Sequence, residues 1–148
     1  MEGIFPFIQP RIYTADELAV AEELPPYVDV EWNFVSDMPV FVRGDARIVT
    51  GLPAVMSWAW RALHQERFLN EIYTWNYGNE IMIMMGKRWQ PETKIAEAAR
   101  YVRECLRVSP YITDVQEITA AFEKSILRIA CTVVTMYGAQ RLEASYGV

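Results

Sequence analysis

Residues 112–137, ITDVQEITAAFEKSILRIACTVVTMY, decide the fold class of this chain. Residues 112–122 and 126–137 are rich in β-branched side chains, and Glu123-Lys-Ser125 between them has the composition of a turn. In the second segment alternate positions form one apolar face, which comprises Leu127, Ile129, Cys131 and Val133. The stretch therefore predicts a β-hairpin with one buried face, and we expect residues 139–148 to add one more short strand.

Two helices are predicted before the hairpin. The first covers residues 51–69, because apolar side chains recur at helical spacing at Leu52, Val55, Met56, Ala59 and Leu63. The second covers residues 91–108: Pro91 suits a first helical position, and Ser109-Pro110 ends the pattern. Residues 70–90 between them are irregular, apart from the short apolar segment Ile81–Met85.

The first third of the chain has a different character. Residues 28–50 alternate apolar and polar side chains and predict several short strands. Residues 1–27 hold four prolines and predict an N-terminal arm with a short helix over 15–23. The whole order predicts an α+β fold, a mostly antiparallel sheet with two main helices packed on it and a C-terminal hairpin with an exposed edge. Residues 28–148 are expected to form a single domain.

Composition excludes several classes of protein. The 148 residues carry a net charge of −5, and the sequence pI is near 4.9, which argues against a nucleic-acid partner. The longest apolar run, Ile81–Met85, is far shorter than the ~18 residues that a membrane span requires, so no membrane partner is expected. The N-terminus lacks the basic and apolar regions of a signal peptide. We therefore expect synthesis in a cytoplasm.

Residue types that carry chemistry form no catalytic, cofactor-binding or metal-binding motif. His64 is the single histidine, and no second His or CxxC accompanies it to hold zinc. Cys105 and Cys131 are expected to be reduced core residues. The dispersed glycines form no phosphate-binding loop. We assign no catalytic residue, no cofactor and no metal ligand, and we do not expect an enzyme.

Aromatic and methionine side chains are abundant. The chain has five Trp, eight Tyr, six Phe and seven Met, more than a small core readily buries. Trp75 and Tyr77 flank a turn, and Trp89 follows Lys87-Arg88. Aromatic and methionine side chains are enriched in protein interfaces, so the surplus predicts a protein partner.

The run 72–81, IYTWNYGNEI, followed by Gly86-Lys87, resembles a signature of the prophage baseplate family typified by the defective phage PBSX. That signature reads Tyr-x-Trp-Asn-Tyr-Gly-x-Glu-Leu…Gly-Lys. The family belongs to the baseplate wedge and sheath-initiator superfamily of contractile tails and type VI secretion systems. Supporting matches, which extend the resemblance to about residues 28–140, are Trp32–Phe34, Gly51–Val55, Glu66–Phe68, Ile112–Val115, Cys131–Val133 and Tyr137-Gly138.

The chain departs from the superfamily at one motif. Many members open the strand after the second helix with an Arg, whereas this chain has Pro110-Tyr111-Ile112 there. A contact that the Arg makes in relatives must be made differently here. The superfamily's "lysozyme-like" label gives this chain no activity, because a name at the level of the fold does not define a site.

The resemblance implies a structural subunit of the inner baseplate wedge that templates the first sheath ring. The implied partners are the large paired wedge proteins, the tail sheath and the tail tube or hub, in a six-fold arrangement. The wedge contacts that it implies are Tyr73, Trp75, Asn76, Tyr77, Gly78, Glu80, Gly86 and Lys87. The candidates for sheath contacts are Leu127, Ile129, Tyr137, Arg141, Leu142 and Glu143.

A free strand edge on the C-terminal hairpin would suit this role, because an edge can accept a strand from a partner. The expected location is the tail baseplate of a phage, a tailocin or another tail-like particle. Two alternatives stay open. One is a small peptidoglycan hydrolase that uses two acidic residues held across a cleft, for which the sequence offers no motif. The other is a soluble adaptor, unrelated to tails, whose aromatic patch binds a peptide.

Overall fold

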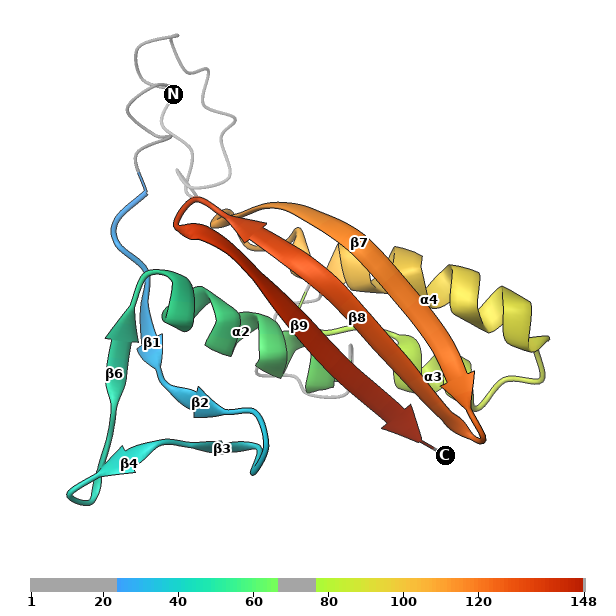
Figure 1. Ribbon diagram of the computed structural model, residues 1–148, viewed down its shortest axis with the longest axis horizontal. Helices are drawn as coiled ribbons and strands as arrows, with labels where there is room; N and C mark the ends of the chain where they lie inside the picture. The colour runs from blue at the N-terminus through green and yellow to red at the C-terminus, as the bar shows by residue number, and fades with distance from the viewer. Residues whose placement is uncertain (1–23, 67–76, 148) are drawn as a thin grey trace, which may run out of the picture.

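The computed structural model describes residues 24–66 and 77–147 (Figure 1). Six short strands come first: β1 (Val28–Val30), β2 (Trp32–Asn33), β3 (Met38–Pro39), β4 (Phe41–Val42), β5 (Asp45–Ala46) and β6 (Ile48–Thr50). Three helices follow in the described part: α2 (Leu52–His64), α3 (Ile81–Met85) and α4 (Pro91–Leu106). The chain then forms β7 (Ile112–Glu123), β8 (Ile126–Thr135) and β9 (Gly138–Gly147). This order confirms the predicted α+β class.

The C-terminal strands form an antiparallel sheet in the order β7-β8-β9. The pairs Glu123↔Ile126 and Thr135↔Gly138 close two loops of two residues each. The predicted hairpin is confirmed, with its second strand ending at Thr135. The tail forms a full ten-residue strand that pairs with β8 along its whole length.

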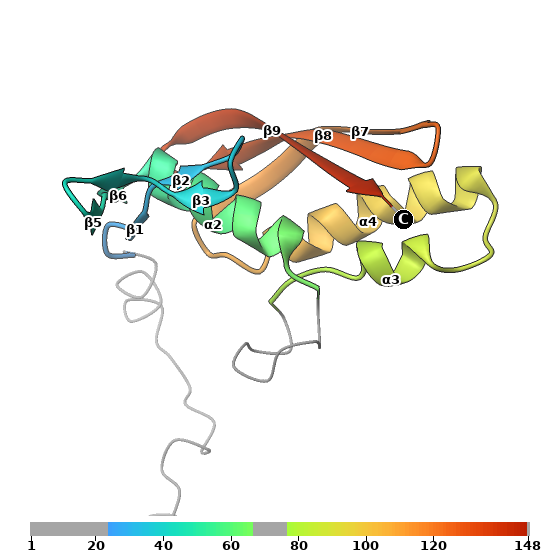
Figure 2. The ribbon, with the colours of Figure 1, turned by 90° about the horizontal axis from the view of Figure 1, so that it is seen from below.

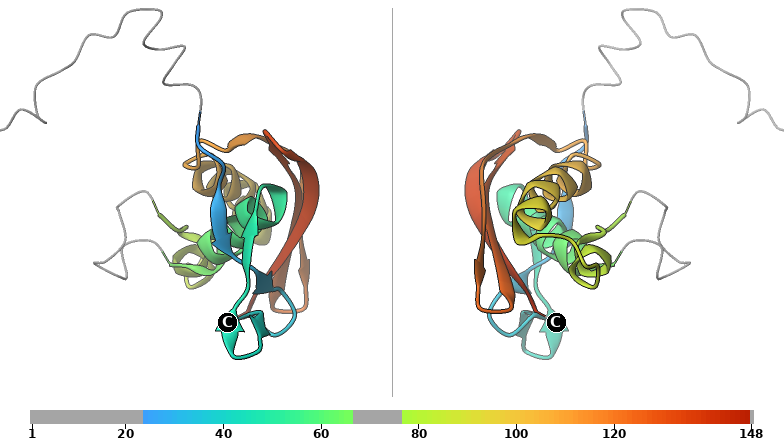
Figure 3. Two further views of the ribbon diagram at one scale, coloured as in Figure 1. Left: turned by 90° about the vertical axis from the view of Figure 1, so that its left-hand side faces the viewer. Right: turned by 90° about the vertical axis from the view of Figure 1, so that its right-hand side faces the viewer.

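The core lies between this sheet and the helices, as the side and end views show (Figures 2 and 3). Helix α2 packs under β9 and helix α4 under β7. The predicted apolar face of β8 is confirmed, because its four members, Leu127, Ile129, Cys131 and Val133, are all at most 3% exposed. Val55 and Met56 of α2 and Val102 and Leu106 of α4 belong to the same buried core cluster.

Helix α2 is shorter than the sequence predicts. It begins after Gly51, whose φ of 71° lies in the left-handed region that favours glycine, and Pro53 occupies the first turn as expected. It ends at His64, because Gln65 turns to an extended conformation, whereas the apolar pattern runs on to residue 69. Helix α4 agrees with its prediction to within two residues.

The strands of residues 28–50 pair two by two, as β1–β6, β2–β3 and β4–β5, and together form what we term the β-arm. The β-arm lies beside α2 at one end of the molecule (Figure 1). Asp29 fixes it to α2 through an ion pair with Arg61 and accepts a hydrogen bond from the Tyr27 hydroxyl at 3.0 Å. The strands predicted over this stretch are therefore confirmed, although they do not form one continuous hairpin.

Of the predicted N-terminal arm, residues 24–27 lie within the described part, and the predicted helix over 15–23 lies outside it. Leu24 and Tyr27 pack against the core. The Tyr111 hydroxyl donates a hydrogen bond of 2.7 Å to the carbonyl oxygen of Pro25. These contacts fix the chain just before β1 to the start of β7.

Candidate protein-binding surfaces

The aromatic motif of residues 73–87 is described in part. Three of its predicted contact residues lie outside the described residues: Tyr73, Trp75 and Asn76. Tyr77, Gly78 and Glu80 lead into α3, and Gly86 and Lys87 follow its last turn. The Tyr77 ring meets the Trp58 ring of α2 edge to face, with centroids 6.0 Å apart. The described part of the motif therefore packs on α2 at one end.

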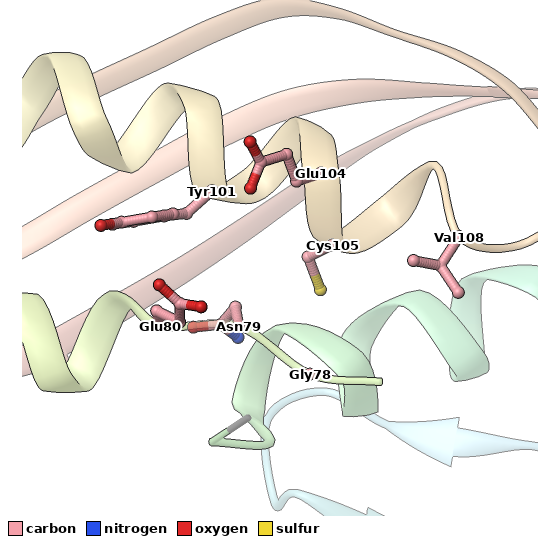
Figure 4. A pocket seen from close by; sticks show the side chains of 7 residues that line it. All are labelled: Gly78, Asn79, Glu80, Tyr101, Glu104, Cys105 and Val108. Carbon is pink, nitrogen blue, oxygen red and sulfur yellow. The ribbon is translucent and has the colours of Figure 1, made fainter. Parts of the chain in front are cut away.

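The segment Gly78–Glu80 forms one wall of a pocket of about 230 Å³ (Figure 4). Helix α4 supplies the other wall, with Tyr101, Glu104 and Cys105. The Cys105 side chain points from α4 toward the Gly78–Glu80 segment, and the Glu80 carboxylate points toward α4 (Figure 4). The structure thus brings the segment Gly78–Glu80 of the motif against α4 and places two carboxylates, Glu80 and Glu104, in one pocket.

Asn79 is the structural centre of this segment, and the sequence interpretation did not single it out. Its side-chain amide donates to the carbonyl oxygens of Ala62 at 3.0 Å and Leu63 at 2.6 Å. Its Oδ1 accepts a bond from the amide of Ile81 at 3.0 Å, at the start of α3. An Asn just before an apolar run was the available signal, because Asn side chains satisfy unpaired backbone groups at helix ends. These bonds also explain why α2 ends where it does.

The far end of the motif is exposed. Gly86 ends α3, and the amide of Lys87 donates to the Met84 carbonyl at 3.0 Å. The Lys87 ammonium lies 4.9 Å from the centroid of the Trp89 ring, and this ring is 38% exposed. Tryptophan is enriched among the residues that contribute most to binding at protein interfaces.

The six predicted sheath contacts do not share one surface. The side chains of Leu127, Ile129 and Leu142 are buried against the helices, each at most 3% exposed. The side chains of Arg141 and Glu143 lie on the opposite, outer face of β9. The outer face and the backbone of β9 are therefore more open to a partner than these three buried side chains.

Tyr137, the sixth candidate, lies in the β8–β9 turn, and its side chain already contacts Tyr27 and Tyr111. Its hydroxyl accepts a hydrogen bond of 3.0 Å from the amide of Tyr27. Its ring stacks at 6.3 Å on Tyr111, which in turn lies 4.8 Å from the ring of Tyr27. Tyr111 stands near the position where many superfamily members carry Arg, and here it holds the chain before β1 in place.

The outer edge of β9 is continuous. In a hairpin with a two-residue loop the closing pair is hydrogen-bonded, so Thr135 and Gly138 bond each other and pairs alternate from there. The amides and carbonyls of residues 139, 141, 143, 145 and 147 consequently point away from β8. No backbone hydrogen bond from the described residues reaches this edge. It therefore offers a row of donors and acceptors.

The opposite edge of the sheet is interrupted. The register of β7 shifts between Gln116 and Thr119, and Glu117 between them has a φ of 51°. The Arg141 guanidinium reaches across the outer face and donates to the Glu117 carbonyl oxygen at 2.9 Å. A bulge of this kind blunts an edge against strand pairing, so β9 carries the usable edge.

A groove of about 420 Å³ runs along the β9 edge. Five consecutive residues of β9, Arg141 to Ser145, line it together with Phe34 of the β-arm and with Trp60 and His64 of α2. The Phe34 and Trp60 rings stack at 4.8 Å, and the Trp60 and His64 rings stack at 4.0 Å. The floor of the groove is therefore a row of three stacked rings.

Asp37 holds this row in place. One oxygen of its carboxylate accepts hydrogen bonds from the indole Nε1 of Trp60 at 2.8 Å and of Trp32 at 2.9 Å. These two bonds lower the pKa of the Asp37 carboxyl below its usual range, the bond from Trp60 contributing most. The sequence interpretation missed the groove, although Trp60 and His64 lie four residues apart, a spacing that places two side chains on one helix face.

Within residues 24–66 and 77–147 no cluster of three or more His, Cys, Asp or Glu could hold a metal ion. No helix of that part is long and apolar enough to cross a membrane. The described residues present an exposed strand edge, a groove of stacked rings and the exposed Lys87–Trp89 pair. Such features are typical of proteins that assemble with others.

The chain belongs to the contractile injection system sheath initiator family, whose family model matches residues 28–138. This match confirms the resemblance to contractile-tail baseplate proteins. The protein is accordingly a structural component of a contractile injection system and interacts with other components of the tail. No curated protein matches the sequence.

Proposed function

We propose that this chain is an inner-wedge subunit of the baseplate, which joins wedge proteins to the tail tube and templates the first sheath ring. The observation that carries the proposal is the continuous outer edge of β9, ten residues long and unpaired within the described part of the chain. The sheath would bind there by adding a strand. The bulged edge of β7 supports the choice of β9.

Strand addition uses the backbone, so it makes modest demands on the partner's sequence. Five residues of β9, from 139 to 147, each offer an amide and a carbonyl to an added strand. In this proposal Arg141 and Glu143 flank the added strand on the outer face. Leu127, Ile129 and Leu142 act indirectly, because their burial fixes the sheet on the helices.

The motif from Tyr73 to Lys87 is proposed as the contact with the large paired wedge proteins. The packing of Tyr77 on Trp58 and the exposure of Trp89 beside Lys87 support this assignment. Residues 28–148 would act as one wedge-like domain and residues 1–27 as an arm that reaches a neighbour. Synthesis in the host cytoplasm and six-fold assembly around the tube complete the proposal.

Immunogold electron microscopy of tail-like particles from an induced lysate tests this location. We expect gold at the baseplate, below the first sheath ring. An epitope tag at an accessible position, verified on the purified protein, serves as the control. Particles without gold, with the protein free in the lysate, would contradict the proposal and favour a soluble adaptor.

A peptidoglycan-clearing assay separates the structural role from a hydrolase. The pocket that holds Glu80 and Glu104 is the place to test, because a glycoside hydrolase needs two carboxylates across a cleft. We expect no clearing by the purified protein. Clearing that disappears in Glu80→Gln or Glu104→Gln would contradict the structural role.

A further inference from the structure

We infer that the groove beside β9 selects the strand that is added there: it accepts the apolar side chains of an extended segment of the sheath subunit, laid over Phe34, Trp60 and His64. The inference rests on the proposed function, because it requires that the partner binds at the β9 edge. It goes further because it names the side chains that contact the added strand and the sequence pattern that this strand must have.

The geometry of a fourth strand leads to this assignment. An added strand lies about 4.8 Å beyond β9, and its side chains alternate between the outer face and the face toward the helices. Helix α2 underlies β9, and its residues Trp60 and His64 line the groove just beyond that strand. The inward side chains of the added strand therefore meet the stacked rings and the inward-facing residues of β9 that also line the groove, Leu142 and Ala144.

The groove is built before the partner arrives. Asp37 fixes the Trp60 indole, and the His64 Nδ1 donates a hydrogen bond of 2.7 Å to the Trp60 carbonyl oxygen. A floor that is already ordered loses little conformational entropy on binding. Flat aromatic rings offer a large contact area to aliphatic or aromatic side chains. The groove consequently favours apolar residues at alternate positions of the segment.

Charge on the outer face completes the pattern. Arg141 is engaged with the Glu117 carbonyl oxygen at 2.9 Å and lies 3.8 Å from the Glu117 carboxylate. Glu143, two residues along the same edge, makes no ion pair with any described residue. Opposite charges on neighbouring strands attract, so the added strand should carry Lys or Arg beside Glu143. The expected occupant is thus an extended segment with apolar residues inward and a basic residue outward.

Photo-crosslinking identifies the occupant directly. The full chain carries p-benzoylphenylalanine at position 64, or at the exposed position Glu92 on α4 as the control, and is irradiated with the purified sheath subunit of the same tail system. We expect a crosslink from position 64, and mass spectrometry should place it on an apolar residue of a segment with alternating pattern. A crosslink only from position 92, or from neither position, overturns the inference.

Affinity measurements by biolayer interferometry, with the same sheath subunit, test the groove and the strand edge separately. His64→Asp puts a charge into the groove at an exposed position, and Glu143→Lys reverses the outer charge; each should weaken binding at least tenfold. Glu143→Pro removes an outward amide and should abolish binding. If Glu143→Pro abolishes binding while His64→Asp has wild-type affinity, the groove inference fails and the proposed function stands. If Glu143→Pro binds normally, the proposed function fails. Circular dichroism verifies that each variant is folded.

Discussion

Asn79 and Tyr146 donate hydrogen bonds to the same acceptor, the carbonyl oxygen of Leu63, and both bonds measure 2.6 Å. This carbonyl belongs to the last turn of α2, where helix carbonyls lack a partner within the helix. Asn79 comes from the segment before α3, and Tyr146 comes from the end of β9. One buried acceptor therefore joins the end of α2, the start of α3 and the edge strand of the sheet.

We predict that loss of both donors costs more than the sum of the single losses. Tyr146→Phe should lower the free energy of unfolding by about 1 kcal/mol, and Asn79→Ala by about 2–3 kcal/mol, because Asn79 has several bonds. Each single variant leaves one donor for the Leu63 carbonyl, whereas the double variant leaves none. Urea unfolding of the four proteins measures the coupling. If the loss of stability in the double variant equals the sum of the two single losses, the shared acceptor does not couple the two residues.

The Asp37 carboxylate makes the stability of the β-arm depend on pH. Its pKa is lowered in the folded protein by the bonds from Trp60 and Trp32, so its contribution to stability is present above the ordinary carboxyl pKa of about 4. That contribution disappears as the pH falls through the lower folded pKa. We expect Asp37→Asn to be less stable than the wild type at pH 7.

The measurement is the difference in urea unfolding between the two proteins at pH 7, 5 and 3. The difference should stay constant from pH 7 to pH 5 and shrink toward pH 3. Glu92→Gln, a change at an exposed position of α4, serves as the matched control and should show no such trend. A difference that grows as the pH falls would contradict the assignment.

The two cysteines should be chemically inert in the folded protein. Burial raises the pKa of the Cys131 thiol to about 11, and Cys105 is also a buried thiol. We expect neither thiol to react with Ellman's reagent within minutes at pH 8. Both should react at once in 8 M urea, on the order of the concentration that unfolds most domains. Rapid reaction of one thiol per folded chain would contradict the described packing.

Trp75 remains the predicted centre of the wedge contact, although it lies outside the described residues. Truncation of a tryptophan at the centre of an interface commonly costs 2 kcal/mol or more, roughly a thirtyfold loss of affinity. Trp75→Ala should therefore lower the yield of particles from an induced lysate while the purified chain keeps its melting temperature. Counting particles by electron microscopy measures this effect, and an unchanged yield counts against the assignment.

The elements that follow from local patterns could be predicted. The alternation from Leu127 to Val133 and the Pro91 and Ser109-Pro110 boundaries define β8 and α4 closely, because burial on one face and backbone restriction are local properties. The end of α2 could not be predicted in this way. It depends on the Asn79 amide, which comes from a position 17 residues after Ala62 in the sequence.

The candidate sites also differ in whether consecutive residues or distant segments form them. The aromatic motif from Tyr73 to Lys87 was visible because its residues are consecutive. The groove was not visible, because Phe34, Trp60 and Glu143 come from three distant segments that only the fold brings together. The sequence also assigned Leu142 to a sheath contact, whereas the alternation within β9 buries its side chain and leaves Glu143 outside.

The most direct test of the central claim is the fraction of tails that carry sheath when Glu143→Pro replaces the wild-type chain in the producing strain. Proline removes one outward amide of β9 and leaves the bonds to β8 intact, whereas Glu143→Ala retains that amide and serves as the control. We predict baseplates and tubes without sheath for Glu143→Pro and sheath on most tails for Glu143→Ala, which loses the charge but keeps the strand edge, counted by negative-stain electron microscopy. Fully sheathed tails with Glu143→Pro would contradict the account.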